Sequence, residues 1–87
     1  MGVTRQRFPV NPEEIIAWLN EEGMVELDRD FQADGDLFAA GLDSMAVMQL
    51  VVAAEEKFNV VLGPQDITRA NLATPRAMAD LFAAKSS

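Results

Sequence analysis

One uninterrupted segment, residues 45–58, constrains the fold of this chain more than any other. It contains no glycine or proline and consists largely of strong helix formers, and Asp43 and Ser44 just before it are both favoured at helix starts. Apolar residues recur along it at helical spacing and form a complete core-facing stripe: Val47, Leu50, Val51, Ala54 and Phe58. We therefore predict a long helix that packs this stripe into a core.

A second helix is predicted over residues 12–22, earlier in the chain. Asn11 can cap it, Pro12 suits the first helical position, and Glu14 completes a capping box. Gly23 suits the left-handed residue just beyond a helix end. The apolar residues flanking the cap are expected to pack together as a hydrophobic staple: Val10 and Ile15.

The last helix is predicted over residues 75–84, because Thr74 and Pro75 repeat the cap-then-proline start. Its apolar face is formed by residues at helical spacing: Met78, Leu81 and Phe82. Before it, residues 64–69 predict a short third helix.

Residues 24–43 have no sustained period and contain many acids with Gly35 and Gly41, which predicts a long ordered loop between the first two helices. Apolar residues are expected to hold this loop on the core: Leu27, Phe31, Leu37, Phe38 and Leu42. The whole pattern predicts one all-α domain over residues 1–87. It is a four-helix bundle of three longer helices and a short third one, with frayed tails at 1–9 and 85–87.

Composition and charge exclude several classes of function. The chain has 7 Lys and Arg against 14 Asp and Glu, and its formal net charge of −7 disfavours binding to nucleic acids and to anionic lipids. It has no cysteine and no histidine, so a thiol nucleophile, the usual general base and the usual metal ligands are missing, and only carboxylates, hydroxyls and two lysines remain for chemistry. No apolar run is long enough to span a membrane. We expect a cytoplasmic, monomeric protein that is not an enzyme.

Four interpretations of Ser44 and its surroundings can be weighed from the residues alone. A calcium loop starting at Asp30 fails because its twelfth position, Gly41, is not a glutamate. A serine hydrolase fails because Leu42 and Ala46 occupy the flanking positions that need glycine, and no histidine can complete a triad. Ser44 either caps the long helix or accepts a phosphate-containing group, which the helix N-terminus would stabilise.

The long helix also carries a second apolar stripe, formed by Met45, Met48 and Val52. It lies beside polar residues, namely Gln49, Glu55 and Glu56. Exposed methionines with a charged border are typical of adaptable partner-binding surfaces. We refer to these six residues as the methionine face and expect it to bind a partner.

The segment Asp36-Leu37-Phe38-Ala39-Ala40-Gly41-Leu42-Asp43-Ser44-Met45 resembles the phosphopantetheine attachment motif of acyl and peptidyl carrier proteins. The resemblance continues through Glu55-Glu56-Lys57-Phe58 and Ala73-Thr74-Pro75 and covers most of the chain. It implies a carrier fold in which a phosphopantetheinyl transferase attaches 4′-phosphopantetheine to Ser44, with Asp43 assisting the transferase and its magnesium. The thiol that the chain lacks would then come from the cofactor.

The resemblance also implies partners and a subtype. The methionine face matches the helix that carriers dock on an acyl- or aminoacyl-activating ligase (an adenylation enzyme or acyltransferase) and on a downstream synthase or transferase. Met45-Ala46 and the neutral Gln49 look less like fatty-acid carriers and more like discrete aminoacyl carriers, including D-alanyl carriers and those of natural-product pathways such as antibiotic biosynthesis. A D-alanyl or fatty-acid carrier is the alternative within the family. An unmodified helical interaction module is the alternative outside it.

Overall fold

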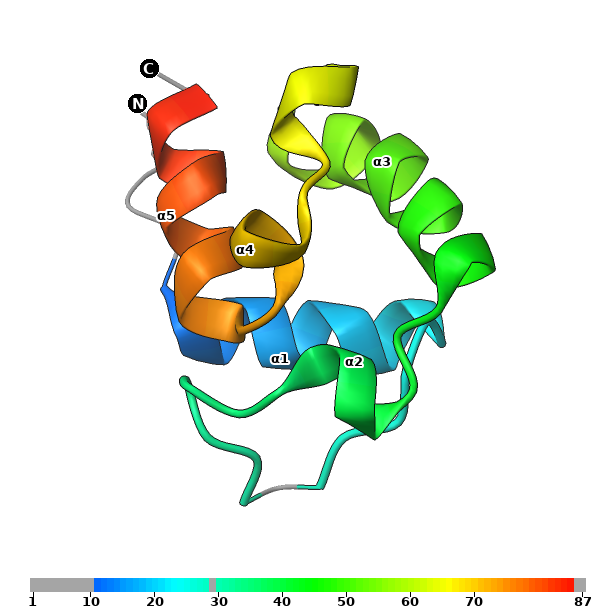
Figure 1. Ribbon diagram of the computed structural model, residues 1–87, viewed down its shortest axis with the longest axis vertical. Helices are drawn as coiled ribbons and strands as arrows, with labels where there is room; N and C mark the ends of the chain where they lie inside the picture. Colours follow the sequence, from blue (N-terminus) through cyan, green and yellow to red (C-terminus); the bar gives the residue numbers. More distant parts are fainter. Residues whose placement is uncertain (1–10, 29, 86–87) are drawn as a thin grey trace, which may run out of the picture.

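A computed structural model describes residues 11–28 and 30–85 of the chain, and these residues form helices joined by turns, without a strand. Three helices are long and the others are short (Figure 1). In chain order they are α1 (Pro12–Glu22), α2 (Leu37–Ala40), α3 (Ser44–Phe58), the 3₁₀ helix η1 (Pro64–Asp66), α4 (Arg69–Leu72) and α5 (Pro75–Lys85). The prediction of an all-α domain is confirmed.

The core lies where the three long helices meet. Figure 1 shows α3 and α5 on opposite sides of the molecule, with α1 running across between their lower parts. Trp18 packs edge-on against Phe58 and Phe82, with ring centroids 5.0 and 5.7 Å apart. Each of these rings comes from a different long helix, so the aromatic contacts join α1, α3 and α5.

The predicted ends of α1 are confirmed. The Asn11 side chain accepts a hydrogen bond from the Glu14 N–H at 2.8 Å, and the Glu14 side chain accepts one from the Asn11 N–H at 3.4 Å. Gly23 ends the helix in the left-handed conformation with a φ of 73°. The predicted staple involves Val10, which lies outside the described residues.

The long loop between α1 and α3 contains a helix that the sequence prediction missed. The Asp36 side chain caps α2 by accepting the N–H groups of Phe38 and Ala39 at 3.0 and 3.2 Å. Leu37 is fully buried, and its N–H donates to the Ala73 carbonyl at 2.7 Å. The loop is therefore tied to the segment before α5, as its apolar residues had suggested. A four-residue helix is too short to show a hydrophobic period.

The predicted short helix over residues 64–69 is two separate elements, because Ile67 leaves the helical conformation after η1. The Thr68 hydroxyl then caps α4 by accepting the Asn71 N–H at 3.1 Å. The predicted frayed C-terminal tail over residues 85–87 began one residue too early. Lys85 is the last residue of α5, and its Nζ lies 2.8 Å from Asp66 Oδ2, so this residue is held in the fold.

Candidate functional site

Ser44 is the first residue of α3, and its side chain does not cap this helix. The cap of α3 is Asp43, whose Oδ1 accepts the Ala46 N–H at 2.9 Å. Both Asp43 and Ser44 are exposed to solvent. Within the described residues the Ser44 hydroxyl has no hydrogen-bond partner. Asp43, and not Ser44, therefore caps α3, and the interpretation of Ser44 as the capping residue is wrong.

The turn before α3 brings Ser44 to the surface. Gly41 ends α2 with a φ of 123°, a conformation that favours glycine. Next to it Leu42 is buried, and its N–H donates to the Leu37 carbonyl at 3.0 Å. The chain is thus anchored on the core immediately before it starts α3 in the open.

The start of α3 is also electrostatically suited to a phosphate group. The N–H groups in the first turn of an α-helix lack intrahelical acceptors, and this end of the helix carries a partial positive charge. Asp43 satisfies the Ala46 N–H, whereas in the part of the chain that is described nothing accepts from the N–H groups of Ser44 and Met45. A phosphodiester on the Ser44 hydroxyl therefore suits this position.

A groove with a volume of about 470 Å³ opens beside Ser44. Its apolar lining comes from α2, α3, α4 and the segments between them: Phe38, Leu42, Val47, Ile67 and Leu72. Its polar lining consists of Asp43, Ser44, Thr68 and Arg69. We call this cavity the serine groove. The sequence analysis missed it because its walls come from segments that are not adjacent in the chain.

The methionine face lies on the exposed side of α3. The side chains of Met45, Met48 and Val52 are 74%, 72% and 59% exposed, as the second stripe predicted. The polar members of the face, Gln49, Glu55 and Glu56, are exposed too. The first stripe is directed inward, with Leu50 and Ala54 completely buried and Val47, Val51 and Phe58 packed at the edge of the core.

A second groove, with a volume of about 530 Å³, adjoins the methionine face. It is lined by Met24 after the end of α1, by Met48 and Val52 of α3, and by Glu22 and Glu56. The lining combines an apolar floor with carboxylates. Such a surface is complementary to a partner that offers an apolar side chain flanked by cations.

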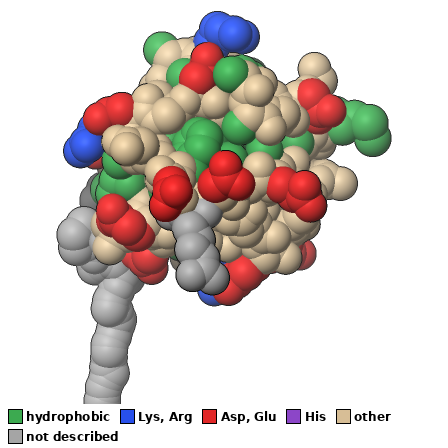
Figure 2. Space-filling model, turned by 90° about the horizontal axis from the view of Figure 1, so that it is seen from below, with side chains coloured by type: hydrophobic (Ala, Val, Ile, Leu, Met, Phe, Trp, Pro, Cys, Tyr) green, Lys and Arg blue, Asp and Glu red, His purple; other side chains and the backbone are tan. Residues whose placement is uncertain are grey.

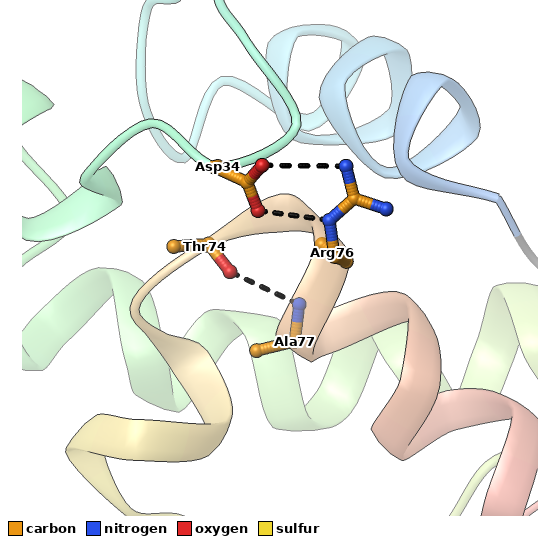
Figure 3. A network of polar contacts seen from close by, with 4 residues as sticks. All are labelled: Asp34, Thr74, Arg76 and Ala77. Atoms are coloured by element: carbon orange, nitrogen blue, oxygen red, sulfur yellow. Dashed lines mark hydrogen bonds and ion pairs between the residues drawn. The ribbon is translucent and has the colours of Figure 1, made fainter.

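A polar contact between Asp34 and Arg76 fixes the loop that leads to α2. Arg76 Nε donates to Asp34 Oδ1 at 2.8 Å, while the Thr74 hydroxyl caps α5 by accepting the Ala77 N–H at 3.0 Å (Figure 3). The Arg76 hydrogen bond holds the pKa of Asp34 below its ordinary value. Both Asp34 and Arg76 are largely exposed, so we assign them to loop positioning and not to a site.

Acidic side chains are spread over the surface seen from below, with basic ones at its margins (Figure 2). Among the residues of the two described ranges, no cluster of three or more acidic, histidine or cysteine side chains is arranged to hold a metal ion. None of the helices in these ranges is both long and apolar enough to cross a membrane.

Comparison with known proteins agrees with this geometry. Residues 14–82 match the family model described as "phosphopantetheine attachment site". No curated protein matches the chain. A similar fold is found in a solved structure, with a TM-score of 0.68 and 28% sequence identity to the present chain. It is the crystal structure of an engineered Bradyrhizobium japonicum glycine:[carrier protein] ligase complexed with a carrier protein from Agrobacterium tumefaciens and ATP. The match covers 80% of the present chain and 92% of that one.

The site fits the attachment of a phosphopantetheine arm, because Ser44 is exposed at the start of a helix and a groove lies beside it. The domain is therefore a substrate-carrying partner of enzymes and not itself a catalyst. The family model covers most of the sequence, including all of α3, most of α1 and most of α5. The chain belongs to the phosphopantetheine-attachment family, whose domains carry a covalent 4′-phosphopantetheine.

Proposed function

We propose that Ser44 is the attachment residue and that the protein carries an acyl or aminoacyl group as a thioester on the attached arm. The observation that carries this proposal is the division of roles at the start of α3. Asp43 makes the capping hydrogen bond, and the neighbouring Ser44 hydroxyl is exposed and unpartnered among the described residues. Modification of the Ser44 oxygen therefore leaves the capping hydrogen bond of α3 unchanged.

The attachment step involves Ser44 and coenzyme A, with a phosphopantetheinyl transferase as catalyst. The Ser44 oxygen forms a bond to the phosphorus of the pantetheine phosphate, the pyrophosphate bond breaks, and adenosine 3′,5′-bisphosphate leaves. The hydroxyl proton is released in the same reaction. Once attached, the cofactor supplies the thiol that holds the cargo. Asp43 precedes Ser44 in the chain, and we propose that its carboxylate contacts the transferase or its magnesium ion.

An aminoacyl-activating ligase is the partner that we propose for loading. The similar carrier from Agrobacterium tumefaciens was crystallised with a glycine:[carrier protein] ligase, and the present chain shares its fold. The methionine face offers the docking surface, since Met48 and Val52 are exposed beside Glu56. We further propose a monomeric carrier of an amino acid in a natural-product pathway, with a downstream synthase or transferase taking the cargo.

The decisive experiment is intact-mass measurement after incubation with a broad-specificity phosphopantetheinyl transferase, coenzyme A and magnesium. The wild type is expected to gain one phosphopantetheinyl group, and Ser44→Ala none. Thr68→Ala is the matched control, because Thr68 is a second hydroxyl on the same groove and should leave modification intact. If the wild type stays unmodified, or Ser44→Ala still gains the group, Ser44 is not the attachment residue. An unmodified, folded wild type would favour the helical interaction module instead.

A further inference from the structure

Arg69 occupies an unusual position for a cation in so acidic a chain. Its guanidinium carbon lies 4.6 Å from the centroid of the Phe38 ring, which belongs to α2. The ion pairs within the described ranges use Arg76 and Lys85 instead, so among these residues Arg69 has no carboxylate partner. The contact with Phe38 restrains the guanidinium, and within residues 11–28 and 30–85 its hydrogen-bond donors have no acceptor.

Arg69 and Ser44 line the same groove. Arg69 is the cationic side chain among the lining residues, and Asp43 is the anionic one. The apolar lining of the same groove includes Val47, Ile67 and Leu72. The serine groove therefore combines the Ser44 hydroxyl and the Arg69 guanidinium with an apolar lining that could contact an uncharged chain.

A group attached to Ser44 would place a new negative charge beside the Asp43 carboxylate. Like charges in close proximity repel, and the acidic surroundings add to the repulsion. A guanidinium offsets this repulsion better than an ammonium, because its planar fork of donors matches two phosphate oxygens at once. Stacking on an aromatic ring uses the face of the guanidinium and leaves the donor edge available.

We propose that Arg69, restrained by Phe38, binds the phosphodiester of the arm on Ser44 and thereby directs the arm into the serine groove. This inference rests on the proposed attachment at Ser44. It makes Arg69 a positioning residue: the guanidinium selects one direction for a flexible arm, and the apolar floor contacts the uncharged part that follows. Without Arg69, the arm is expected to sample solvent more freely.

The test compares ¹⁵N-labelled protein before and after attachment of the arm by NMR, with intact mass measured on each sample. In the wild type, attachment should shift the Arg69 Nε–H signal and the backbone amides of residues 67–72. In Arg69→Gln the amide shifts should fall to less than half, and Arg69→Lys should be intermediate because it keeps the charge without the fork. Lys57→Gln is the matched control: it removes the same charge from an exposed residue near the far end of α3, and it should behave like the wild type.

Two results would overturn this proposal, and they are distinguishable. If the mass shows the arm on Ser44 but the amides of residues 67–72 shift equally in Arg69→Gln and the wild type, only the role of Arg69 is wrong. If the mass shows no arm on Ser44, the proposed attachment fails and the role of Arg69 fails with it. An additional check is salt: the shifts in the wild type should shrink as ionic strength rises, since exposed ion pairs are screened.

Discussion

Replacing Asp43 separates its structural role from its chemical one. Asp43→Ala removes the hydrogen bond from the Ala46 N–H, which is 2.9 Å long and partly buried. Loss of a single N-cap side chain costs about 1 kcal/mol, within a range of roughly 0.5–2 kcal/mol. For a domain of this size, 1 kcal/mol corresponds to a fall in melting temperature of about 4–8 °C. Asp43→Asn keeps an oxygen acceptor of the same reach, so it should cost less than about 0.5 kcal/mol.

The assay is urea denaturation of both variants and of Ser44→Ala, followed by circular dichroism and by the fluorescence of the single tryptophan. Ser44→Ala should unfold like the wild type, because the Ser44 side chain does not make the capping bond. The reasoning would be refuted if Asp43→Ala were as stable as the wild type. It would also be refuted if Asp43→Asn were as unstable as Asp43→Ala, since the charge and not the cap bond would then matter.

The same variants test the chemical role of Asp43. Asp43→Asn retains the fold but removes the negative charge next to Ser44, so its phosphopantetheinylation should slow by about tenfold or more, as expected for the loss of one contact to a charged group. Initial rates measured by intact mass give the comparison. Equal rates for Asp43→Asn and the wild type would assign Asp43 to capping alone.

Two further predictions concern the partner face and acid stability. Met48→Glu should leave the fold intact, because Met48 is 72% exposed. It should lower kcat/KM for loading of the phosphopantetheinylated protein by the ligase about tenfold or more, as expected for the loss of an apolar anchor residue of an interface. Val61→Glu, at a 64% exposed position outside α3, is the control and should load normally; equal losses in both variants would contradict the assignment of the face. Hydrogen bonds from Lys85 and from the Gly63 N–H hold the pKa of Asp66 in the folded protein below its ordinary value of 3.8. The Asp66 carboxylate therefore stabilises the fold above pH 3.8. This stabilisation is lost as the pH falls through the pKa that Asp66 has in the folded protein. Asp66→Asn should therefore lose stability at neutral pH and show a weaker acid dependence in urea titrations, and Asp34, whose pKa is also lowered, should still contribute in this variant; an unchanged dependence would contradict this role.

The elements that could be predicted from the sequence are those whose signals are local. The caps at Asn11 and Thr74 depend on residues within one turn of each other, and both are present in the structure. The two stripes of α3 could be separated because a helix of 15 residues repeats its pattern several times. Ser44 was singled out by the motif around it, and its exposure fits that role.

The features that could not be predicted depend on residues distant in sequence. Arg76 and Asp34 are 42 positions apart, and nothing in either segment indicates that they pair. The Arg69 contact with Phe38 joins two short helices, each too brief to show a period, and the whole of α3 separates these helices in the sequence. The serine groove is missed for the same reason, since its walls exist only after folding.

The aromatic contacts between Trp18, Phe58 and Phe82 also determine when the protein can acquire its shape. During synthesis on the ribosome, Trp18 emerges early, but its second ring partner, Phe82, is added only after most of the described chain has been made. Closing such a distant contact is entropically costly and gains its stabilisation only at the end. We expect nascent chains that lack α5 to leave Trp18 in water and to be prone to aggregation. The serine groove would then be completed only with the last helix, because α4, which forms part of its wall, contacts α5.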